Sequence, residues 1–206
     1  MKRLGILFVV SGPSGAGKGT VLGKVRGEVE GLSMSISATT REPRTGETDG
    51  VDYWFCSKNQ FQEMINNKEF LEYIEKFDNF YGTPKAPVEK LLKEGSDVIL
   101  EIETLGAVNV RTLFPEAVLI FITPQSYDEL KRRLDKRGSE TDEAKALRLK
   151  IALSELSSVG DYDYIAINND VRDCINTIKA IILAERNKRY RYSNLVEELT
   201  TRTNKK

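Results

Sequence analysis

The sequence predicts an α/β fold in which a parallel β-sheet is flanked by helices. Apolar runs suited to buried strands alternate with amphipathic segments suited to helices, which is typical of parallel-sheet proteins. The run at residues 117–122 contains no polar side chain, as expected for a strand covered on both faces. A glycine-rich turn joins the first apolar run directly to the first helical segment. Together, these observations predict one α/β core.

The first part of the chain combines core elements with a block of short strands. Residues 39–50 are polar and contain Pro43, Gly46 and Gly50, so they are predicted to form a loop. Residues 57–60 match a capping box, which begins a helix. Strand patterns dominate residues 32–83, which we interpret as an inserted β-rich lobe. The predicted elements are strands at residues 6–10, 32–37, 51–55, 70–77 and 79–83 and helices at residues 21–29 and 57–67.

The α/β alternation resumes after the lobe. Capping signals at Ser126 and Thr141 each begin a helix of a predicted helical lid, and Gly95 and Gly138 each close a helix. The further predicted elements are strands at 97–102, 117–122 and 164–167 and helices at 87–93, 105–113 and 170–190. We predict a single domain with core segments 1–31, 84–125 and 161–200, the β-rich lobe at 32–83, the lid at 126–160 and a frayed end at 200–206.

Composition narrows the possible partners and mechanisms. Lys plus Arg and Asp plus Glu balance at 31 each, so nothing indicates nucleic acid as a partner. Cys56 and Cys174 match no metal or disulfide spacing, and no apolar run is long enough to span a membrane. The first strand follows Met1 closely, leaving no room for a cleavable signal, so we expect a cytoplasmic protein. Histidine is absent, which excludes mechanisms that need imidazole but not phosphoryl transfer.

The glycine-rich turn matches G-x-x-x-x-G-K, from Gly12 to Lys18. Strand, glycine loop, lysine and helix form the arrangement that cradles a nucleotide's phosphates, which predicts a P-loop NTPase core. The next position is usually Ser or Thr, whose hydroxyl binds Mg²⁺. Here it is Gly19 and the hydroxyl follows at Thr20, so Mg²⁺ is held by Thr20 or through water. The predicted ATP-binding residues of this loop are Gly12, Pro13, Ser14, Gly15, Ala16, Gly17, Lys18, Gly19 and Thr20.

A second motif lies in the loop that follows residue 37. Arg41, Arg44 and Tyr53 supply donors suited to a phosphate, although two arginines alone also fit a solvated charged loop. The segment Ser37–Tyr53 closely resembles the guanylate kinase signature S-x-T-T-R-x-P-R-x-G-E-x-x-G-x-D-Y, and with the P-loop this resemblance spans nearly the whole chain. It implies that Arg41, Arg44, Tyr53 and Tyr81 hold the phosphate of GMP and that Ser37 and Thr83 contact guanine.

Three carboxylates gain roles from this resemblance. Glu72 alone would suit an exposed strand position, but a buried carboxylate there would accept from N1–H and N2–H of guanine and repel the bare N1 of adenine. Glu101 and Glu103 follow an apolar strand and share one of its faces. They could be two solvated charges. The resemblance instead places Glu101 at the metal, directly or through water, and Glu103 near the guanine.

Basic residues in the second half follow the same logic. Arg133 and Arg137 lie on one helix face, a pattern that also fits a solvated basic helix. The guanylate kinase lid has arginines at these positions and at Arg148, which would neutralise charge on the transferred phosphoryl group together with Lys18 and Arg41. Asn168 resembles an adenine-side contact of the family. The basic run at residues 186–191 is predicted to be a solvated helix end.

The resemblance implies an ATP:GMP phosphotransferase that forms ADP and GDP, with dGMP as a second acceptor, in guanine nucleotide synthesis and recycling. Its expected partners are ATP and GMP with Mg²⁺, but neither nucleic acid nor a membrane, and its expected state is monomer or homodimer. Two alternatives stay open. One is a binding module of the same fold without catalysis, and the other is a kinase for a different nucleoside monophosphate.

Overall fold

The computed structural model describes residues 3–76, 78–135, 142–192 and 199. Its core is a five-stranded sheet in the order β2-β7-β1-β8-β9, in which every neighbouring pair is parallel. β1 therefore lies in the centre and carries the glycine loop at its carboxyl end. The strands are β1 (Leu7–Ser11), β2 (Leu32–Met34), β7 (Asp97–Glu101), β8 (Val118–Thr123) and β9 (Tyr164–Ile167).

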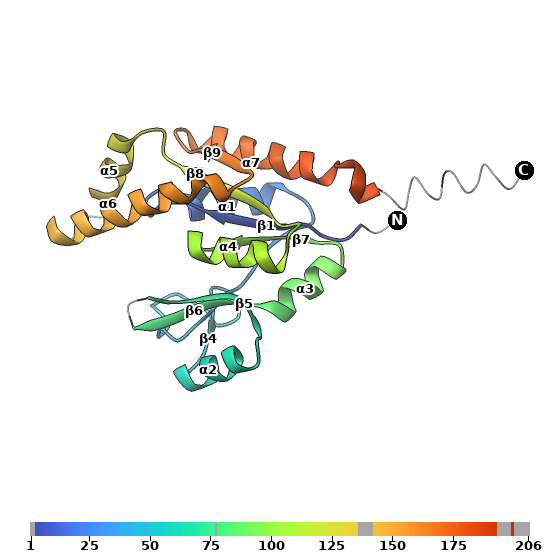
Figure 1. The fold of residues 1–206 in the computed structure, drawn as a ribbon, viewed down its shortest axis with the longest axis horizontal. Helices are drawn as coiled ribbons and strands as arrows, with labels where there is room; N and C mark the ends of the chain where they lie inside the picture. Colours follow the sequence, from blue (N-terminus) through green and yellow to red (C-terminus); the bar gives the residue numbers. More distant parts are fainter. Residues whose placement is uncertain (1–2, 77, 136–141, 193–198, 200–206) are drawn as a thin grey trace, which may run out of the picture.

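Helices cover both faces of the core sheet, so the α/β expectation is confirmed (Figure 1). Successive side chains of β1 point to opposite faces. Phe8 packs with residues of α1 and α7, while Leu7 and Val9 pack with residues of α3 and α4. Burial on both faces explains the apolar strands that the sequence shows. The helices are α1 (Lys18–Glu28), α3 (Lys85–Lys93), α4 (Thr104–Leu113) and α7 (Val171–Arg186).

The β-rich lobe forms a second sheet in the order β4-β3-β6-β5, beside α4 and apart from the core sheet (Figure 1). Phe61 of α2 packs on this sheet, with its ring 4.4 Å from that of Phe70 and 5.4 Å from that of Phe80. The lobe therefore has its own small apolar core. Its elements are β3 (Ala38–Thr39), β4 (Trp54–Phe55), α2 (Lys58–Asn66), β5 (Phe70–Lys76) and β6 (Asn79–Pro84).

The lid region contributes two helices, α5 (Tyr127–Asp135) and α6 (Asp142–Ser157), at one end of the core (Figure 1). Leu130 and Leu134 of α5 pack against Ala152 of α6. The predicted caps at Gly138 and Thr141 lie outside the described residues. Ser126 does accept a hydrogen bond from the Glu129 N–H, but the Glu129 side chain binds Arg132 and Arg133, so the reciprocal half of the predicted capping box is not formed.

Several strand and loop boundaries differ from the prediction. β2 ends at Met34 and pairs with β7, so the opening of the predicted lobe belongs to the core sheet. Thr39, predicted to begin a loop, instead pairs in β3. Residues 51–55 form a strand only over Trp54–Phe55, because the N–H groups of residues 51 and 52 bond to the Thr48 carbonyl in a turn.

Helix ends also differ, for identifiable reasons. α1 begins at Lys18 because Gly17, in a left-handed conformation, is its N-cap. α3 begins at Lys85, before Pro87, because a proline in the first turn removes no helical hydrogen bond. α7 ends at Arg186, where Asn187 caps it, and not at Tyr190. The predicted capping box at Ser57 and the closing Gly95, with φ of 87°, are confirmed.

The basic run at residues 186–191, which starts at the last residue of α7, is not simply solvated. Arg186 and Arg3 both bind Asp97, a fully buried residue at the start of β7, with N–O distances of 2.7 Å and 2.6 Å. The Ile6 N–H donates to the same carboxylate. Burial alone would raise the pKa of Asp97, but these hydrogen bonds together lower it. Asp97 thus ties the segment before β1 and the end of α7 to the start of β7.

The two cysteines, Cys56 and Cys174, are both free. Among the described residues, no helix has the length and apolar character needed to cross a membrane.

Candidate active site

The glycine loop has a backbone that side chains would not permit. Gly12 has φ of 147°, and a Cβ added there would fall 2.0 Å from the Ile122 carbonyl oxygen. Gly17 has φ of 85°, and a Cβ there would fall 2.5 Å from Nδ2 of Asn168. Both positions therefore require glycine. The loop ends at the N-terminus of α1, where free N–H groups and the helix dipole favour an anion.

Lys18 lies over this loop. Its Nζ donates to the carbonyl oxygens of Gly12 at 2.6 Å and Pro13 at 3.4 Å. Burial lowers the pKa of Lys18, and the negative charges of Glu101 and Glu155 oppose that shift. The ammonium group is thus held at the mouth of the loop by weak neutral acceptors, which a phosphate group can replace with stronger charge-assisted bonds.

Asn168 fixes the loop from the far side. It is 2% exposed, and its Nδ2 donates to the Ala16 carbonyl at 2.6 Å. The backbone carbonyl of Asn168 accepts a hydrogen bond from the Arg133 guanidinium at 2.8 Å. Among the described residues, nothing donates to the buried Oδ1 of Asn168. The side chain predicted to contact adenine therefore packs directly against the phosphate loop, with one acceptor left over.

Of the two predicted metal-binding residues, Glu101 lies at the carboxyl end of the sheet, and Thr20 follows Gly19 in the first turn of α1. β1 and β7 pair with Val10 opposite Glu101, which brings Glu101 beside the loop. A Cβ added at Gly19 would lie 3.9 Å from Glu101 Oε2, and Thr20 is exposed in the first turn of α1. Within the described part of the chain, no three acidic, His or Cys residues form a metal site. One carboxylate and one hydroxyl fit Mg²⁺, which keeps most of its waters and binds substrate phosphates.

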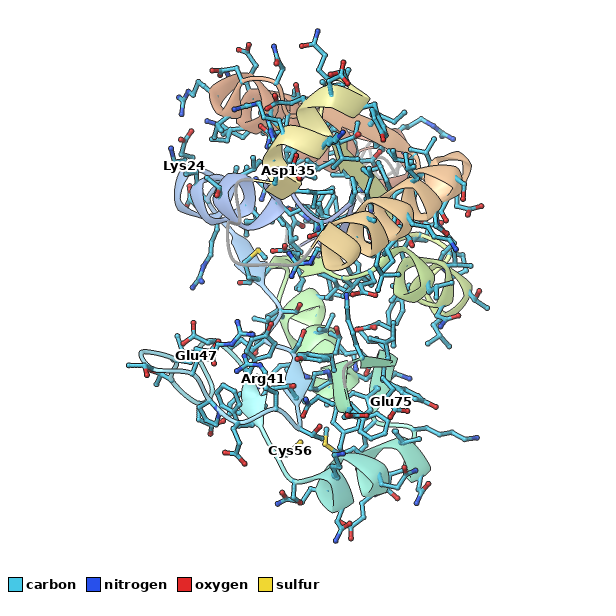
Figure 2. All side chains as sticks on the ribbon, turned by 90° about the vertical axis from the view of Figure 1, so that its left-hand side faces the viewer. Lys24, Arg41, Glu47, Cys56, Glu75 and Asp135 are labelled. Atoms are coloured by element: carbon cyan, nitrogen blue, oxygen red, sulfur yellow. The ribbon has the colours of Figure 1, made fainter. Side chains whose placement is uncertain are left out.

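The predicted acceptor-phosphate residues gather in the β-rich lobe. Arg41 binds both carboxylate oxygens of Glu47, at 3.0 Å and 2.9 Å, and the two residues lie on the same loop (Figure 2). Its guanidinium lies 5.4 Å from the Tyr53 ring centroid, and the Tyr53 and Tyr81 rings are 6.3 Å apart. Arg44 is exposed nearby, and its N–H donates to Glu47. The structure therefore brings these four predicted phosphate ligands together.

The predicted base-selecting carboxylate is buried behind them. Glu72 is 7% exposed, and its Oε1 accepts from the Thr83 hydroxyl at 2.7 Å. A Cβ added at Gly106 would lie 2.8 Å from Glu72 Oε2, so this glycine admits the carboxylate next to α4. Burial is the main reason that the pKa of Glu72 is raised. The pairing of Ala38 with Gly82 brings Ser37 beside Thr83, completing a polar group suited to a purine edge.

Comparisons with known proteins assign the chain to a family. A family model described as Guanylate kinase matches residues 5–185. The chain belongs to the guanylate kinase family. A guanylate kinase of Clostridioides difficile (strain 630) is 50% identical over 196 residues, covering 95% of this chain and 96% of the relative. One from Caldanaerobacter subterraneus subsp. tengcongensis is 49% identical over 186 residues, covering 90% of each. A crystal structure of guanylate kinase from Anaplasma phagocytophilum has a TM-score of 0.77 and 34% identity, covering 96% of this chain and 95% of that one.

The guanylate kinase lid arginines are placed only in part. Arg133 of α5 donates to Glu129 at 2.6 Å and to the Asn168 carbonyl, so it lies beside the phosphate loop. Arg148 lies on α6. Arg137 falls outside the described residues. Thus one of the predicted lid arginines is already seated at the loop.

Two charged residues of this guanylate kinase site were missed from the sequence. The negative charge of Glu155 of α6 opposes the lowering of the Lys18 pKa, and burial is the main reason that the pKa of Glu155 itself is raised. Lys76 of β5 forms an ion pair with Glu103, the N-cap residue of α4. The alternation of β5 could have indicated Lys76, because Glu72, Ile74 and Lys76 share one face. No sequence signal indicated Glu155.

Residues 101–103 link the two halves of the site. Glu101 ends β7 beside the phosphate loop, Ile102 is buried in the core, and Glu103 begins α4 beside the lobe. The charge of Glu103 contributes to the raised pKa of Glu72, after the larger effect of burial. Residues 101–103 thus form a junction between the anion-binding loop and the buried carboxylate of Glu72. Such an arrangement can align two nucleotides.

Proposed function

We propose that this chain transfers the γ-phosphoryl group of ATP to GMP, and to dGMP, forming ADP and GDP. The observation that carries the proposal is the buried carboxylate of Glu72, which accepts a hydrogen bond from Thr83. It lies in the lobe, and residues 101–103 connect this side of the site to the phosphate loop. A phosphate loop alone serves many nucleotide-binding proteins. A desolvated carboxylate in the lobe would select an acceptor base with two adjacent donors, which is the edge that guanine presents.

The donor nucleotide would bind at the glycine loop. Backbone N–H groups and Lys18 would hold the β- and γ-phosphates, with Asn168 keeping the loop in shape. Mg²⁺ would be held by Thr20 and Glu101, directly or through water. When bound, it supplies positive charge to the β- and γ-phosphate oxygens. Lys18 would bring a second positive charge to the phosphoryl group. Because Lys18 is largely buried, this charge would act in a partly dehydrated site.

The acceptor would lie in the β-rich lobe. Arg41 and Arg44 would bind the GMP phosphate, with Tyr53 and Tyr81 adding hydroxyl donors. Ser37 and Thr83 would contact the base beside Glu72. Because Arg41 is already held by Glu47, with its guanidinium 5.4 Å from the Tyr53 ring centroid, its side chain is positioned before GMP arrives. These contacts position the GMP phosphate toward the phosphate loop.

The chemistry needs no general base. The second pKa of a phosphate monoester is about 6, so the attacking GMP oxygen is already anionic near neutral pH. This matches a chain that contains no histidine. Rate enhancement would come from alignment of the two nucleotides and from positive charge, with Arg41, Arg133, Arg137 and Arg148 joining Lys18. Closure of lobe and lid would exclude the water that hydrolyses ATP.

We infer that the enzyme works in the cytoplasm on small-molecule substrates, as a monomer or homodimer. Its core, lobe and lid would act as three parts of one domain. Its balanced charge and free cysteines support this assignment.

A coupled assay tests the proposal by offering GMP, dGMP, AMP, CMP and UMP separately with ATP and Mg²⁺. We expect turnover with GMP and dGMP, and at least about thousandfold lower kcat/KM with AMP. Turnover with AMP but not GMP would indicate a kinase for another nucleoside monophosphate. Binding of GMP without turnover would indicate a non-catalytic module. Either result would contradict the proposed function.

A further inference from the structure

Lys76 is a charged residue of the β-rich lobe that contacts the core. It is the last residue of β5, and its ammonium group forms an ion pair with Oε1 of Glu103, the N-cap of α4. The Lys76 and Glu103 side chains are 40% and 37% exposed, so the pair is accessible to a ligand. This pair thus joins the lobe to the junction between the two half-sites.

Lys76 also shares a strand face with Glu72. Residues 72, 74 and 76 are shielded to different degrees, whereas Tyr73 and Glu75 between them are exposed. The face that carries the base-selecting carboxylate therefore continues to Lys76. On the other side, α4 presents Gly106 against Glu72, and Glu103 lies one helical turn before that glycine. Glu72, Glu103 and Lys76 consequently line one region between β5 and α4.

This region holds two carboxylates and one ammonium group. Burial raises the pKa of Glu72, and the nearby negative charge of Glu103 acts in the same direction. Lys76 supplies positive charge next to that second carboxylate.

The guanine edge offers one donor more than Glu72 can use. N1–H and one hydrogen of the 2-amino group can face the two oxygens of Glu72, which leaves the second amino hydrogen without a partner. We propose that Lys76 is a positioning residue for guanine recognition: it holds Glu103 so that the remaining carboxylate oxygen accepts this second amino hydrogen. The inference rests on the proposed function, because it requires GMP as the acceptor.

The test compares GMP with inosine monophosphate, which lacks the 2-amino group, in the full-length protein. For Lys76→Met we expect KM for GMP to rise about tenfold while kcat stays within about twofold. KM for inosine monophosphate should stay unchanged, so that discrimination between the two acceptors falls by the same factor. Lys76→Arg should retain most of the discrimination because it keeps the charge. Lys58→Met, an exposed lysine of the same lobe, is the matched control and should change neither constant.

A double-mutant cycle tests whether Lys76 acts through Glu103. In a Glu103→Ala background, adding Lys76→Met should change KM for GMP by less than about twofold. An equal rise in KM for both acceptors would overturn the proposal, because it would indicate a structural or phosphate-binding role. A lower KM for GMP in Lys76→Met would also overturn it, since guanine would then compete with Lys76. Absence of GMP turnover in the unsubstituted protein would instead remove the proposed function, and with it this inference.

Discussion

The donor side of the site is formed mainly by the backbone, whereas the acceptor side is formed mainly by charged side chains. At the donor side, backbone geometry dominates: Gly12 and Gly17 leave no room for side chains, and the loop continues a strand buried on both faces. At the acceptor side, charged side chains dominate and are paired with one another, as in the contact between Arg41 and Glu47. Even Glu72, the proposed base-selecting carboxylate, is held mainly by one hydroxyl group.

This difference has a functional consequence. A site made of backbone N–H groups depends on the whole fold and recognises what all nucleoside triphosphates share, their phosphates. A site made of a few charged side chains recognises one base and can be changed by one substitution without disturbing the core. Substitutions on the two sides should therefore affect the two substrates separately, and this separation can be measured.

The largest effect is expected for Lys18→Met. Removing this charge should lower kcat/KM for ATP by about 10³-fold, because in the proposed mechanism the buried Lys18 brings positive charge to the phosphoryl group. GMP binding, measured by calorimetry without ATP, should stay within about twofold if the acceptor site is independent. Lys24→Met, an exposed lysine further along α1 (Figure 2), is the matched control. A parallel loss of GMP affinity would show that the two sides are not separable.

A smaller loss, of the other substrate, is expected for Glu72→Gln. The amide group would replace one acceptor with a donor that faces the donors of guanine, so kcat/KM for GMP should fall by about 10²-fold. The Kd for ATP should change less than twofold. Glu75→Gln provides the control, because Glu75 lies on the exposed face of the same strand. Equal losses for GMP and ATP would argue against a base-selecting role for Glu72.

The donor side was also the more predictable of the two from sequence. The spacing of Gly12, Gly17 and Lys18 is local, and a phosphate loop needs little else. The residues that were missed on each side make long-range contacts: Glu155 influences Lys18 from α6, and Lys76 reaches Glu103 from the sheet of the lobe. Such contacts depend on how distant segments pack, which spacing along one chain does not reveal.

The same reasoning explains the errors in secondary structure. Buried strands and capped helices such as the one at Ser57 carry local signals and were predicted correctly. The short strand at Ala38–Thr39 has no such signal, because it is formed by pairing with β6. Arg186 looked like a solvated residue because its partner, Asp97, is distant in sequence. Local sequence patterns thus predict helices and strands, whereas tertiary contacts determine which charged residues form ion pairs.

The smallest effect on either substrate is expected for Asp97→Asn, at the start of β7 and away from the loop. At pH 7 both KM values should be unchanged, while the free energy of unfolding should fall by about 2–3 kcal/mol, because Arg3 and Arg186 lose their shared anion.

The folded-state pKa of Asp97 is lowered, so its contribution to stability exists above the unfolded pKa of about 4 and is lost as the pH falls through the folded pKa. Urea denaturation should therefore show the two proteins converging in stability below about pH 4. Glu28→Gln, which removes an exposed carboxylate paired with Arg172 and Lys179, is the control and should lose less stability at pH 7. A change in KM for only one substrate would mean that the core sheet around Asp97 stabilises one side of the site more than the other. The difference between the donor side and the acceptor side would then include the residues of the core.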